Sequence, residues 1–328
     1  MPLLTLSEAD ELAAAALRRC HTSEGNAATV AKALVRAEAE GLASHGLLRL
    51  PIYAAQTRAG KIDGHATPTV EEPRPALLWI DARNGFACPA LDEAVRALPK
   101  VARLQGLAAA AIRRSHHCGV AGHPVRKLAD AGMVAMLFAN APAAMAPWGG
   151  KRAVFGTDPI AFGCPVAGHE PIVVDMSLSK VARGNILTAM RKGEPIPEGW
   201  AFDSDGNPTT DPEAALAGTM VPLGDAKGTA LALMVELLAA GLSGAFYAYE
   251  ASSFLDAEGP PPGTGQFIIA IDAAAFGDSL NRFAALAAAI EEQPGARLPG
   301  TRRAEYFRKA EQFGLNVSDR LIAEINAL

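Results

Sequence analysis

The chain has 328 residues, of which half are hydrophobic and a fifth are charged, and its net charge is −5. This composition is typical of a globular enzyme and excludes a disordered chain. Because no block of like charge occurs, neither nucleic acid nor an anionic membrane surface is expected as a partner.

The four cysteines lie far apart and form no CxxC pair: Cys20, Cys88, Cys118 and Cys164. This spacing predicts free thiols in a reducing cytosol. The first residues, MPLLTLSEADEL, lack a basic region, and charge or proline interrupts the apolar segments well short of a membrane span. We therefore expect a cytoplasmic protein without a secretory signal.

The chain is expected to begin with two helices. Thr5 or Ser7 can cap a helix that continues over residues 9–19. Apolar residues at helical spacing predict a second helix over residues 26–40, and Gly41 can end it in the left-handed conformation.

The segment SHGLLRLPIY comes next, and Ser44 is well placed to cap a third helix that Pro51 limits or bends. On such a helix, His45 and Arg49 stand four residues apart and share one face. Two interpretations are open from these residues alone. Ser44 is a cap beside a structural histidine and a surface cation, or His45 is a proton donor one turn from a carboxylate-binding arginine.

Strands and helices then alternate, which predicts an α/β or α+β class and leaves the strand directions open. Strands are expected at residues 76–81, 107–112, 133–139, 161–164, 171–175 and 266–271. Helices are expected at residues 92–105, 123–131, 231–240, 276–292 and 301–313. Residues 186–211 are polar and rich in proline and glycine, which predicts a covering loop close to the site.

The usual nucleotide-binding fingerprints are absent from the sequence. It contains neither G-x-G-x-x-G between a strand and a helix nor G-x-x-x-x-G-K-[ST]. Glycine-rich turns could still let backbone amides approach a phosphate, although each is a weak signal: Gly119/Gly122, Gly149–Gly150 and Gly224/Gly228.

Two other chemistries remain open as alternatives. His116, His117, Cys118 and His123 could hold a metal, but their spacing fits none of the usual zinc patterns. Ser44, His45 and Asp175 could act in hydrolysis, but the sequence lacks the G-x-S-x-G elbow.

Six segments occur in the order typical of one family: SHGLLRLPIY, RSHHCGVAGHPV, APWGGKRAVFGTDPIAFGCP, VVDMSLSKVARGNI, GEPIPEGWAFDSDGNPTTDP and the apolar helix at residues 231–242. Nearly the whole chain thus resembles the malate/L-lactate dehydrogenase-like superfamily, a non-Rossmann group of NAD(P)-dependent oxidoreductases. SHHCG, ASSFLDAEGPPPGTGQ and LPGTRR are most similar to the Δ1-piperideine-2-carboxylate/Δ1-pyrroline-2-carboxylate reductase branch.

This resemblance implies an α/β fold with a largely antiparallel cofactor-binding sheet, flanked by helices from both chain ends. It also implies a homodimer with sites near the interface. Residues 1–75 would form a helical domain completed by residues 276–328. Residues 76–275 would form the sheet domain, with a lid-like insertion at residues 186–219.

The resemblance further implies roles for individual residues. His45 matches the proton donor, Ser44 the relay beside it, and Arg49 and Thr157 the substrate ligands. The matching cofactor-binding positions are His117, Cys118, Gly119, Val120, Ala121, Asp175, Met176, Ser177, Arg183, Gly184, Lys227, Gly228, Gly300, Thr301, Arg302, Arg303 and Tyr306. The chain departs from the pattern at the relay position Asn185, an Asp in part of the branch, and at Gly224–Asp225, where two glycines are common.

The activity implied is NADPH-dependent reduction of cyclic imino acids, Δ1-pyrroline-2-carboxylate and Δ1-piperideine-2-carboxylate, to L-proline and L-pipecolate. Arg302 and Arg303 could hold a 2′-phosphate, which favours NADP over NAD. The pathway served, whether proline, hydroxyproline or lysine catabolism, is left open. The alternatives are a 2-keto acid (malate/lactate) or ureidoglycolate dehydrogenase of the same fold and, in another class, a metal-dependent hydrolase.

Overall fold

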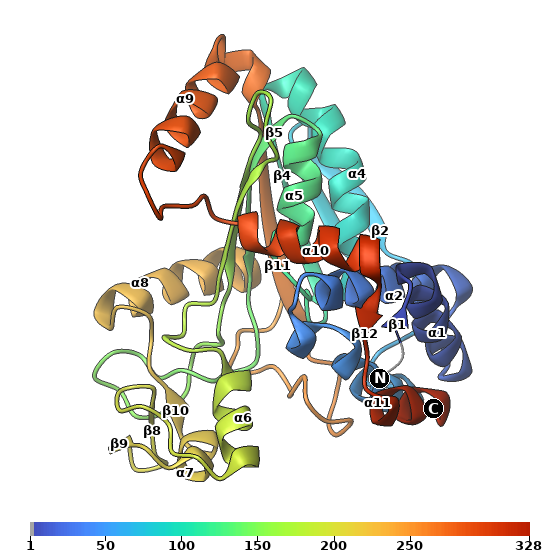
Figure 1. Ribbon diagram of the computed structural model, residues 1–328, viewed down its shortest axis with the longest axis vertical. Helices are drawn as coiled ribbons and strands as arrows, with labels where there is room; N and C mark the ends of the chain where they lie inside the picture. Colours follow the sequence, from blue (N-terminus) through green and yellow to red (C-terminus); the bar gives the residue numbers. More distant parts are fainter. Residues whose placement is uncertain (1–2) are drawn as a thin grey trace.

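A seven-stranded sheet lies at the centre of the computed structural model, which describes residues 3–328 (Figure 1). The strand order is β2-β3-β4-β11-β5-β6-β7. The strands are β2 (Thr69–Arg74), β3 (Leu77–Asp81), β4 (Leu107–Ser115), β11 (Thr264–Asp272), β5 (Met133–Ala139), β6 (Ile160–Cys164) and β7 (Ile172–Met176). The pair β3–β4 is parallel and the other neighbouring pairs are antiparallel, so the expected largely antiparallel sheet is confirmed.

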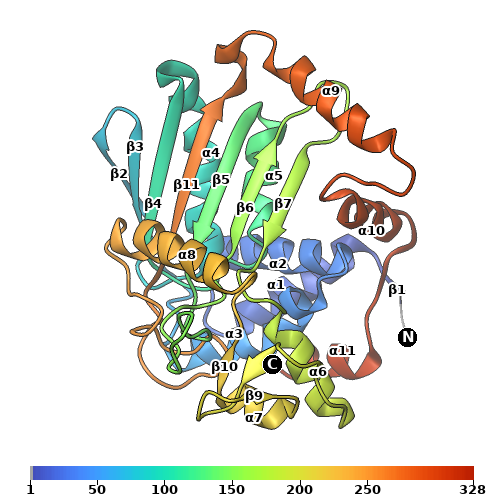
Figure 2. The ribbon, with the colours of Figure 1, turned by 90° about the vertical axis from the view of Figure 1, so that its left-hand side faces the viewer.

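Helices cover both faces of this sheet (Figure 2). On one face, α4 (Ala87–Gln105) and α5 (Gly122–Asp130) form a core with β3, β4, β5 and β11. This core is rich in alanine, whose small side chain lets helix and sheet approach closely. On the other face, Phe138 and Phe267 pack with α8 (Ala226–Val235) and the π-helix η3 (Glu236–Gly241).

A helical layer beside the sheet joins the two ends of the chain (Figure 1). Its buried apolar residues come from both N-terminal and C-terminal elements. These are β1 (Leu3–Leu4), α1 (Leu6–Arg19), α2 (Glu24–Ala39), the 3₁₀ turn η2 (Leu47–Arg49), α3 (Leu50–Arg58), α10 (Thr301–Phe313), β12 (Leu315–Asn316) and α11 (Asp319–Asn326). The 3₁₀ turn η1 (Ala43–His45), which has no buried residue, lies between α2 and η2. β1 pairs with β12, and Thr5 caps α1 in a reciprocal capping box with Glu8.

The 3₁₀ turn η4 (Ala273–Phe276) and helix α9 (Ser279–Glu291) follow β11. α9 buries Ala287 against Val166 and Leu298, in a small cluster apart from the helical layer. The division of the chain into two domains stays a prediction. No helix within residues 3–328 is long and apolar enough to cross a membrane.

The insertion at residues 186–219 is more ordered than the loop expected from its composition. It contains most of α6 (Arg183–Lys192), then β8 (Ala201–Phe202), β9 (Pro208–Thr209), α7 (Pro212–Ala217) and the first residue of β10 (Thr219–Met220). β8 pairs with both β9 and β10. Ile186, fully buried in the core of this region, anchors α6, and Gly193 ends the helix in the left-handed conformation.

Candidate functional site

His45 and Arg49 lie on the consecutive turns η1 and η2, not on one helix. The expected third helix beginning at Ser44 is therefore wrong. No side chain caps η1, and α3 begins at Leu50 with Pro51 in its first turn, where the missing N–H of proline is tolerated. The turns fold Arg49 back, so that its Nε donates to Ser44 O at 2.8 Å.

Gly46 separates the two turns because no side chain fits at that position. A Cβ there would lie 2.2 Å from Glu38 Oε2. The same oxygen accepts a hydrogen bond from Leu47 N at 2.9 Å. Glu38, on α2, therefore fixes the turn that follows His45.

The imidazole of His45 is held neutral at ordinary pH. Burial and the neighbouring Arg49 lower the pKa of His45 to about 4, although Asp175 acts in the opposite direction. Its Nδ1 lies 3.1 Å from Ser44 Oγ, and its ring centroid lies 5.3 Å from that of His117. A neutral imidazole in this position can accept a proton from a bound molecule.

Arg49 presents a buried N–H group that no protein atom satisfies. Its Nε is bonded to Ser44, whereas Nη1 is buried and has no partner within residues 3–328. An unsatisfied buried donor costs about 1–3 kcal/mol, more for a charged group. A bound anion would satisfy it, and a guanidinium fork matches a carboxylate.

Two further histidines follow the end of β4. Nδ1 of His117 lies 2.8 Å from Tyr53 Oη, and the ring of His116 packs 4.9 Å from that of Phe254. Both nitrogens of His116 are buried without a partner in the described chain. Burial is the main cause that lowers the pKa of each imidazole, to about 3 for His116, so both rings are neutral.

The end of β7 collects several of the predicted residues. Asp175 Oδ2 accepts hydrogen bonds from Gly122 N at 3.1 Å and from Arg303 Nη1 at 2.7 Å. Next along the chain, Ser177 Oγ and Leu178 N donate to the carbonyl of Thr157 at 3.3 and 2.8 Å. The start of α5, the start of α10 and the Thr157 loop therefore meet at β7.

The helices that begin at the predicted cofactor stretches leave their first amides free of side-chain caps. This holds for α6, α8 and α10, whereas the first amide of α5, Gly122 N, already donates to the Asp175 side chain. Gly119 and Gly300 have φ of 70° and 92°, which favours glycine, and a Cβ at Gly228 would lie 2.2 Å from Leu223 O. Free helix N-termini reached by close backbone approach suit phosphate groups.

The remaining predicted residues differ in their burial and contacts. Arg183 Nε is buried without a partner in the described chain, while its Nη2 donates to Leu216 O at 3.3 Å. Val120 and Ala121 are buried, Cys118, Thr301 and Gly184 are partly buried, and Met176, Lys227, Arg302 and Tyr306 are exposed. A Cβ at Gly184 would lie 3.7 Å from Ser44 Cβ, so the start of α6 lies beside Ser44.

The two departures from the family pattern are both exposed. Asn185 lies in the first turn of α6 and forms no side-chain hydrogen bond within residues 3–328, and its place in a relay stays a prediction. Asp225 lies just before α8 with φ of 59°, where glycine is the residue favoured by the backbone. In the described residues, no group of three His, Cys, Asp or Glu is arranged to hold a metal ion.

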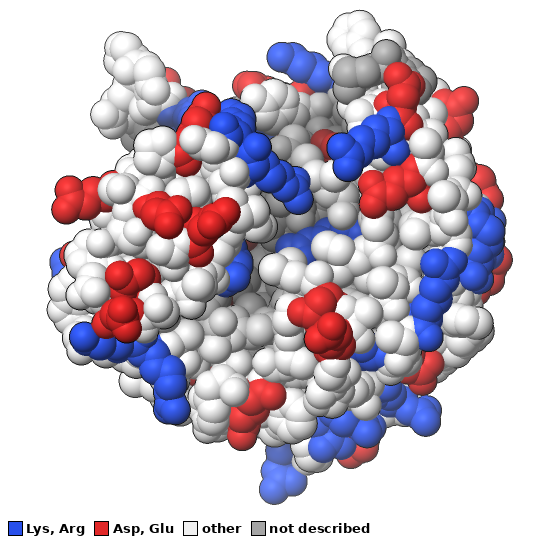
Figure 3. All heavy atoms as spheres, turned by 90° about the horizontal axis from the view of Figure 1, so that it is seen from below, with Lys and Arg blue, Asp and Glu red and all other residues white. Residues whose placement is uncertain are grey.

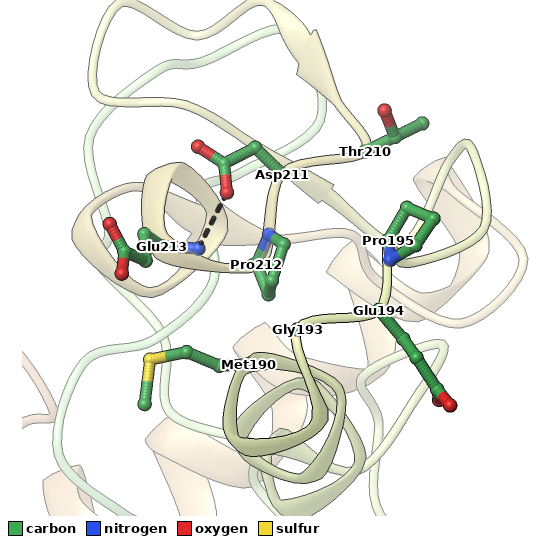
Figure 4. A pocket seen from close by; sticks show the side chains of 8 residues that line it. All are labelled: Met190, Gly193, Glu194, Pro195, Thr210, Asp211, Pro212 and Glu213. Atoms are coloured by element: carbon green, nitrogen blue, oxygen red, sulfur yellow. Dashed lines mark hydrogen bonds between the residues drawn. The ribbon is translucent and has the colours of Figure 1, made fainter.

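Seen from below, the surface is hollowed near its centre, and Lys and Arg side chains border the hollow (Figure 3). A separate pocket of about 420 Å³ lies in the insertion, lined by Met190, Gly193, Glu194, Pro195, Thr210, Asp211, Pro212 and Glu213 (Figure 4). None of the predicted site residues lines that pocket, so it is not the candidate site.

Sequence reasoning missed two aromatic residues that shape the site. Tyr53 is buried one turn after Arg49 and bonds His117, and the four-residue spacing was available as a signal. Phe254 contacts both histidines from a loop distant in sequence. That loop is the ASSFLDAEGPPPGTGQ stretch, but its local sequence does not reveal that it packs against the histidines after β4.

Comparisons with known proteins agree on one family. A sequence profile described as malate/L-lactate dehydrogenase matches residues 4–326. A (2R)-3-sulfolactate dehydrogenase (NADP(+)) of Chromohalobacter salexigens is 52% identical, over 99% of this chain and 97% of that protein. A Δ1-pyrroline-2-carboxylate/Δ1-piperideine-2-carboxylate reductase of Pseudomonas aeruginosa is 41% identical, over 99% and 98%. The crystal structure of Δ1-piperideine-2-carboxylate reductase from Pseudomonas syringae has a TM-score of 0.95 at 36% identity, covering 100% of this chain and 99% of that one.

Proposed function

Because this chain belongs to the malate/L-lactate dehydrogenase family, we propose that it is an NADP-dependent oxidoreductase acting at the carbon next to the carboxylate of a small acid. The observation that carries the proposal is the juxtaposition of His45 and Arg49. One is a neutral, largely buried imidazole, and the other is a guanidinium with an unsatisfied buried N–H. Together they can exchange a proton and grip an anion.

The leading substrate candidate is a small 2-hydroxy acid and its 2-oxo counterpart, of the 3-sulfolactate type. The relative named for that substrate shares 52% of its residues with this chain, against 35–41% for full-length relatives named as pyrroline-2-carboxylate reductases. A neutral His45 also suits this chemistry, since it can take the hydroxyl proton as the hydride leaves.

The second candidate is the cyclic imino acid expected from the sequence. It is favoured by the high structural similarity to a piperideine-2-carboxylate reductase. The ring of His117 lies beside His45, the rings of Tyr53 and Phe254 both lie close to His117, and neutral rings could pack against a cyclic substrate.

The chain's residues fit an NADP cofactor. The uncapped starts of α6, α8 and α10 and the open backbone at Gly119 supply N–H donors for phosphates. Arg303 is held by Asp175 at the start of α10, and Arg302 beside it is exposed and free to bind a 2′-phosphate. When bound, the nicotinamide supplies or accepts the hydride.

The protein's own part is positioning and proton transfer. Arg49 would hold the substrate carboxylate, and Thr157, fixed through its carbonyl by the residues after β7, would contact the substrate. His45 would accept or return the proton on the oxygen or nitrogen beside the reacting carbon. Ser44, 3.1 Å from Nδ1, would orient the imidazole and relay the proton.

One assay separates the candidates. NADPH oxidation is followed at equal concentrations of 3-sulfopyruvate, pyruvate, Δ1-pyrroline-2-carboxylate and Δ1-piperideine-2-carboxylate, and repeated with NADH. The proposal expects the highest kcat/KM with 3-sulfopyruvate and NADPH. A preference for either imine would replace the leading candidate by the second, and no turnover of any of these acids would contradict the proposed function.

Cofactor preference gives a first testable prediction. Arg302→Ala is expected to raise KM for NADPH about tenfold or more, because a charge-assisted hydrogen bond to phosphate contributes about 1.5–3 kcal/mol. KM for NADH should stay within about twofold, since NADH lacks that phosphate. Lys309→Ala, an exposed cation on the same helix, is the matched control. Equal losses with both cofactors would contradict the assignment.

We also infer that two copies of the chain associate through α8 and η3. Six large side chains on and after these elements are exposed in the single chain: Leu231, Leu233, Met234, Leu237, Leu242 and Phe246. An apolar surface of this kind is typical of an interface between subunits. Figure 2 shows α8 lying across the front of the sheet.

The cytosolic location expected from the separated thiols stays a prediction.

Leu237 offers the test of this association, because 54% of its surface is exposed in the single chain. Leu237→Glu is expected to shift the protein from dimer to monomer in sedimentation velocity at micromolar concentration. A charge buried without a partner in an apolar interface is strongly unfavourable. The control is Leu104→Glu on α4, which is even more exposed but far along the chain from this surface. A monomeric wild-type protein would overturn the inference.

A further inference from the structure

Two buried carboxyl groups, those of Asp158 and Glu236, accept hydrogen bonds from the consecutive residues Asn140 and Ala141. Asp158 precedes β6 and Glu236 begins η3, and their exposed fractions are 0% and 3%. Each has one buried oxygen, Asp158 Oδ2 and Glu236 Oε1, that receives no N–H or hydroxyl donor within residues 3–328. Since an ionised carboxylate only accepts, a hydrogen bond between the two requires a proton on one of them.

The other oxygen of each group is bonded to backbone or amide donors. Asp158 Oδ1 accepts from Ala141 N at 3.3 Å. Glu236 Oε2 accepts from Ala248 N at 3.1 Å and from Asn140 Nδ2 at 3.3 Å. A single proton shared between the two oxygens that lack a partner would therefore leave every oxygen of the pair bonded.

No cation neutralises these groups, since neither forms an ion pair within the described chain. Burial, and then Glu236, raises the pKa of Asp158 well above its ordinary value. Burial raises the pKa of Glu236 to about 7, and Glu250, exposed on the turn after η3, acts in the same direction. Tyr247, a further titratable side chain, has its hydroxyl close to Gly241 at the end of η3. Two like charges in this space would repel each other.

The pair adjoins the predicted substrate residue Thr157. Asp158 itself has φ of 39°, an uncommon conformation for a residue with a side chain. Gly156 is pressed against the same neighbour, because a Cβ there would lie 2.2 Å from Ala141 O. The bonds of the Asp158 carboxyl therefore hold the Thr157 peptide in a conformation that it would not adopt unaided.

The same network reaches the histidine segment. Asn140, which donates to Glu236, accepts from Gly265 N at 2.9 Å through its Oδ1. The neighbouring Gln266 donates to the carbonyl of His116 at 3.2 Å. Buried polar groups thus connect the Thr157 loop, η3 and the segment that carries His117, and such networks lose rigidity when one member is removed.

We propose that Asp158 and Glu236 share one proton and act as positioning residues, which hold the Thr157 loop against η3 in the arrangement that the substrate requires. Neither group contacts the reacting atoms. The π-turn at Glu236 supports this role, because π-turns within helices are frequent at functional sites. The inference rests on the proposed function only in taking Thr157 as a substrate ligand.

Replacing the carboxyl groups by amides and by alanine distinguishes the effect of the shared proton on KM from the effect of side-chain volume. In Glu236→Gln, Nε2 can donate to Asp158 in place of the proton, so KM for the acid selected by the assay above should stay within about twofold of wild type at neutral pH. Glu236→Ala should raise that KM about tenfold, as expected for losing one buried hydrogen bond. The Kd of NADPH should not change in either variant. Glu250→Ala, an exposed carboxylate nearby, is the matched control.

Equal KM values for Glu236→Ala and wild type would overturn the positioning role. So would a loss in Glu236→Gln as large as in Glu236→Ala, because the amide would then fail to rescue. If Glu236→Ala does not fold, the test rests on Asp158→Asn and Glu236→Gln, which both keep an N–H donor between the two groups. KM near the wild-type value is expected in both variants, and a raised KM in both would overturn the positioning role.

A second measurement needs no substrate and so stands if the proposed function fails. A carboxyl whose pKa is raised by folding contributes stability at low pH that is lost as the pH rises through its folded pKa. For Glu236 that window ends near pH 7, and for the pair it continues above. The double variant Asp158→Asn/Glu236→Gln has nothing to ionise there. Its Tm relative to wild type should therefore be higher at about pH 8.5 than at about pH 5.5, and parallel Tm curves would overturn the shared proton.

Discussion

Replacing His45 with alanine is expected to lower kcat by about 10²- to 10⁴-fold, the range that a positioned acid or base contributes. The Kd of NADPH should stay within about twofold, because the free helix N-termini and Arg303 are untouched. His65→Ala is the control, since this histidine is exposed and outside the site. Single-turnover reduction and a fluorescence titration with NADPH measure the two quantities separately.

The pH dependence gives this prediction a sign. The pKa of His45 is lowered to about 4, first by burial and then by Arg49. Oxidation of a hydroxy acid needs the neutral imidazole, so kcat/KM in that direction should rise through about pH 4 and then stay level with respect to His45. Reduction needs a proton on His45 and should weaken as the pH rises, except that a bound carboxylate raises the pKa again. Loss of NADPH binding in His45→Ala would assign the residue to the cofactor instead.

Six of the seven strands were predictable because they are short apolar runs between turn residues, whereas β2, whose residues are all exposed, was not expected. The bounds of β5 match the expected residues 133–139, and those of α10 match residues 301–313. β11 and β4 were expected a few residues too short, since their ends carry polar residues whose bonds are made to other strands. Strand direction followed from the family resemblance and not from the pattern, because a fully buried strand reads alike in either orientation.

Two local structures were beyond the sequence pattern. The break at Gly46 depends on Glu38, eight residues earlier, which occupies the space a side chain would need. The π-turn that begins at Glu236 interrupts an apolar run that reads as continuous helix. At Gly46 a carboxyl group from another helix overrides the local preference, and no local spacing reveals that contact.

The candidate site was predictable only through the resemblance. Composition and spacing left His45 open between a structural and a chemical role. The contact between Asp175 and Arg303, 128 residues apart in the chain, has no sequence signal. Asp158 and Glu236 were not predicted as functional residues. The sequence around a single acidic residue does not reveal that its side chain is buried or that a second carboxyl group is also buried nearby.

Arg49→Lys is expected to raise KM for the acid substrate about 10- to 100-fold, with a smaller change in kcat. A lysine keeps the charge but loses the fork of N–H donors, and a bidentate charge-assisted contact contributes about 1.5–3 kcal/mol. The buried Nη1 that now lacks a partner would no longer be available to the carboxylate. The matched control is Arg58→Lys, an exposed arginine at the end of α3. An unchanged KM would remove Arg49 from the substrate site.

Arg49→Ala tests the same residue through its effect on His45. Arg49 is the second cause, after burial, that lowers the pKa of His45, so removing the guanidinium should raise that pKa from about 4 toward the ordinary value. The inflection in kcat/KM for oxidation should then move to higher pH, a shift that lost carboxylate binding alone does not produce. With a methyl ester in place of the acid, the KM penalty of the variant should largely vanish while the pH shift persists. A penalty equal for ester and acid would mean that Arg49 supports the turn at Ser44 without gripping the substrate.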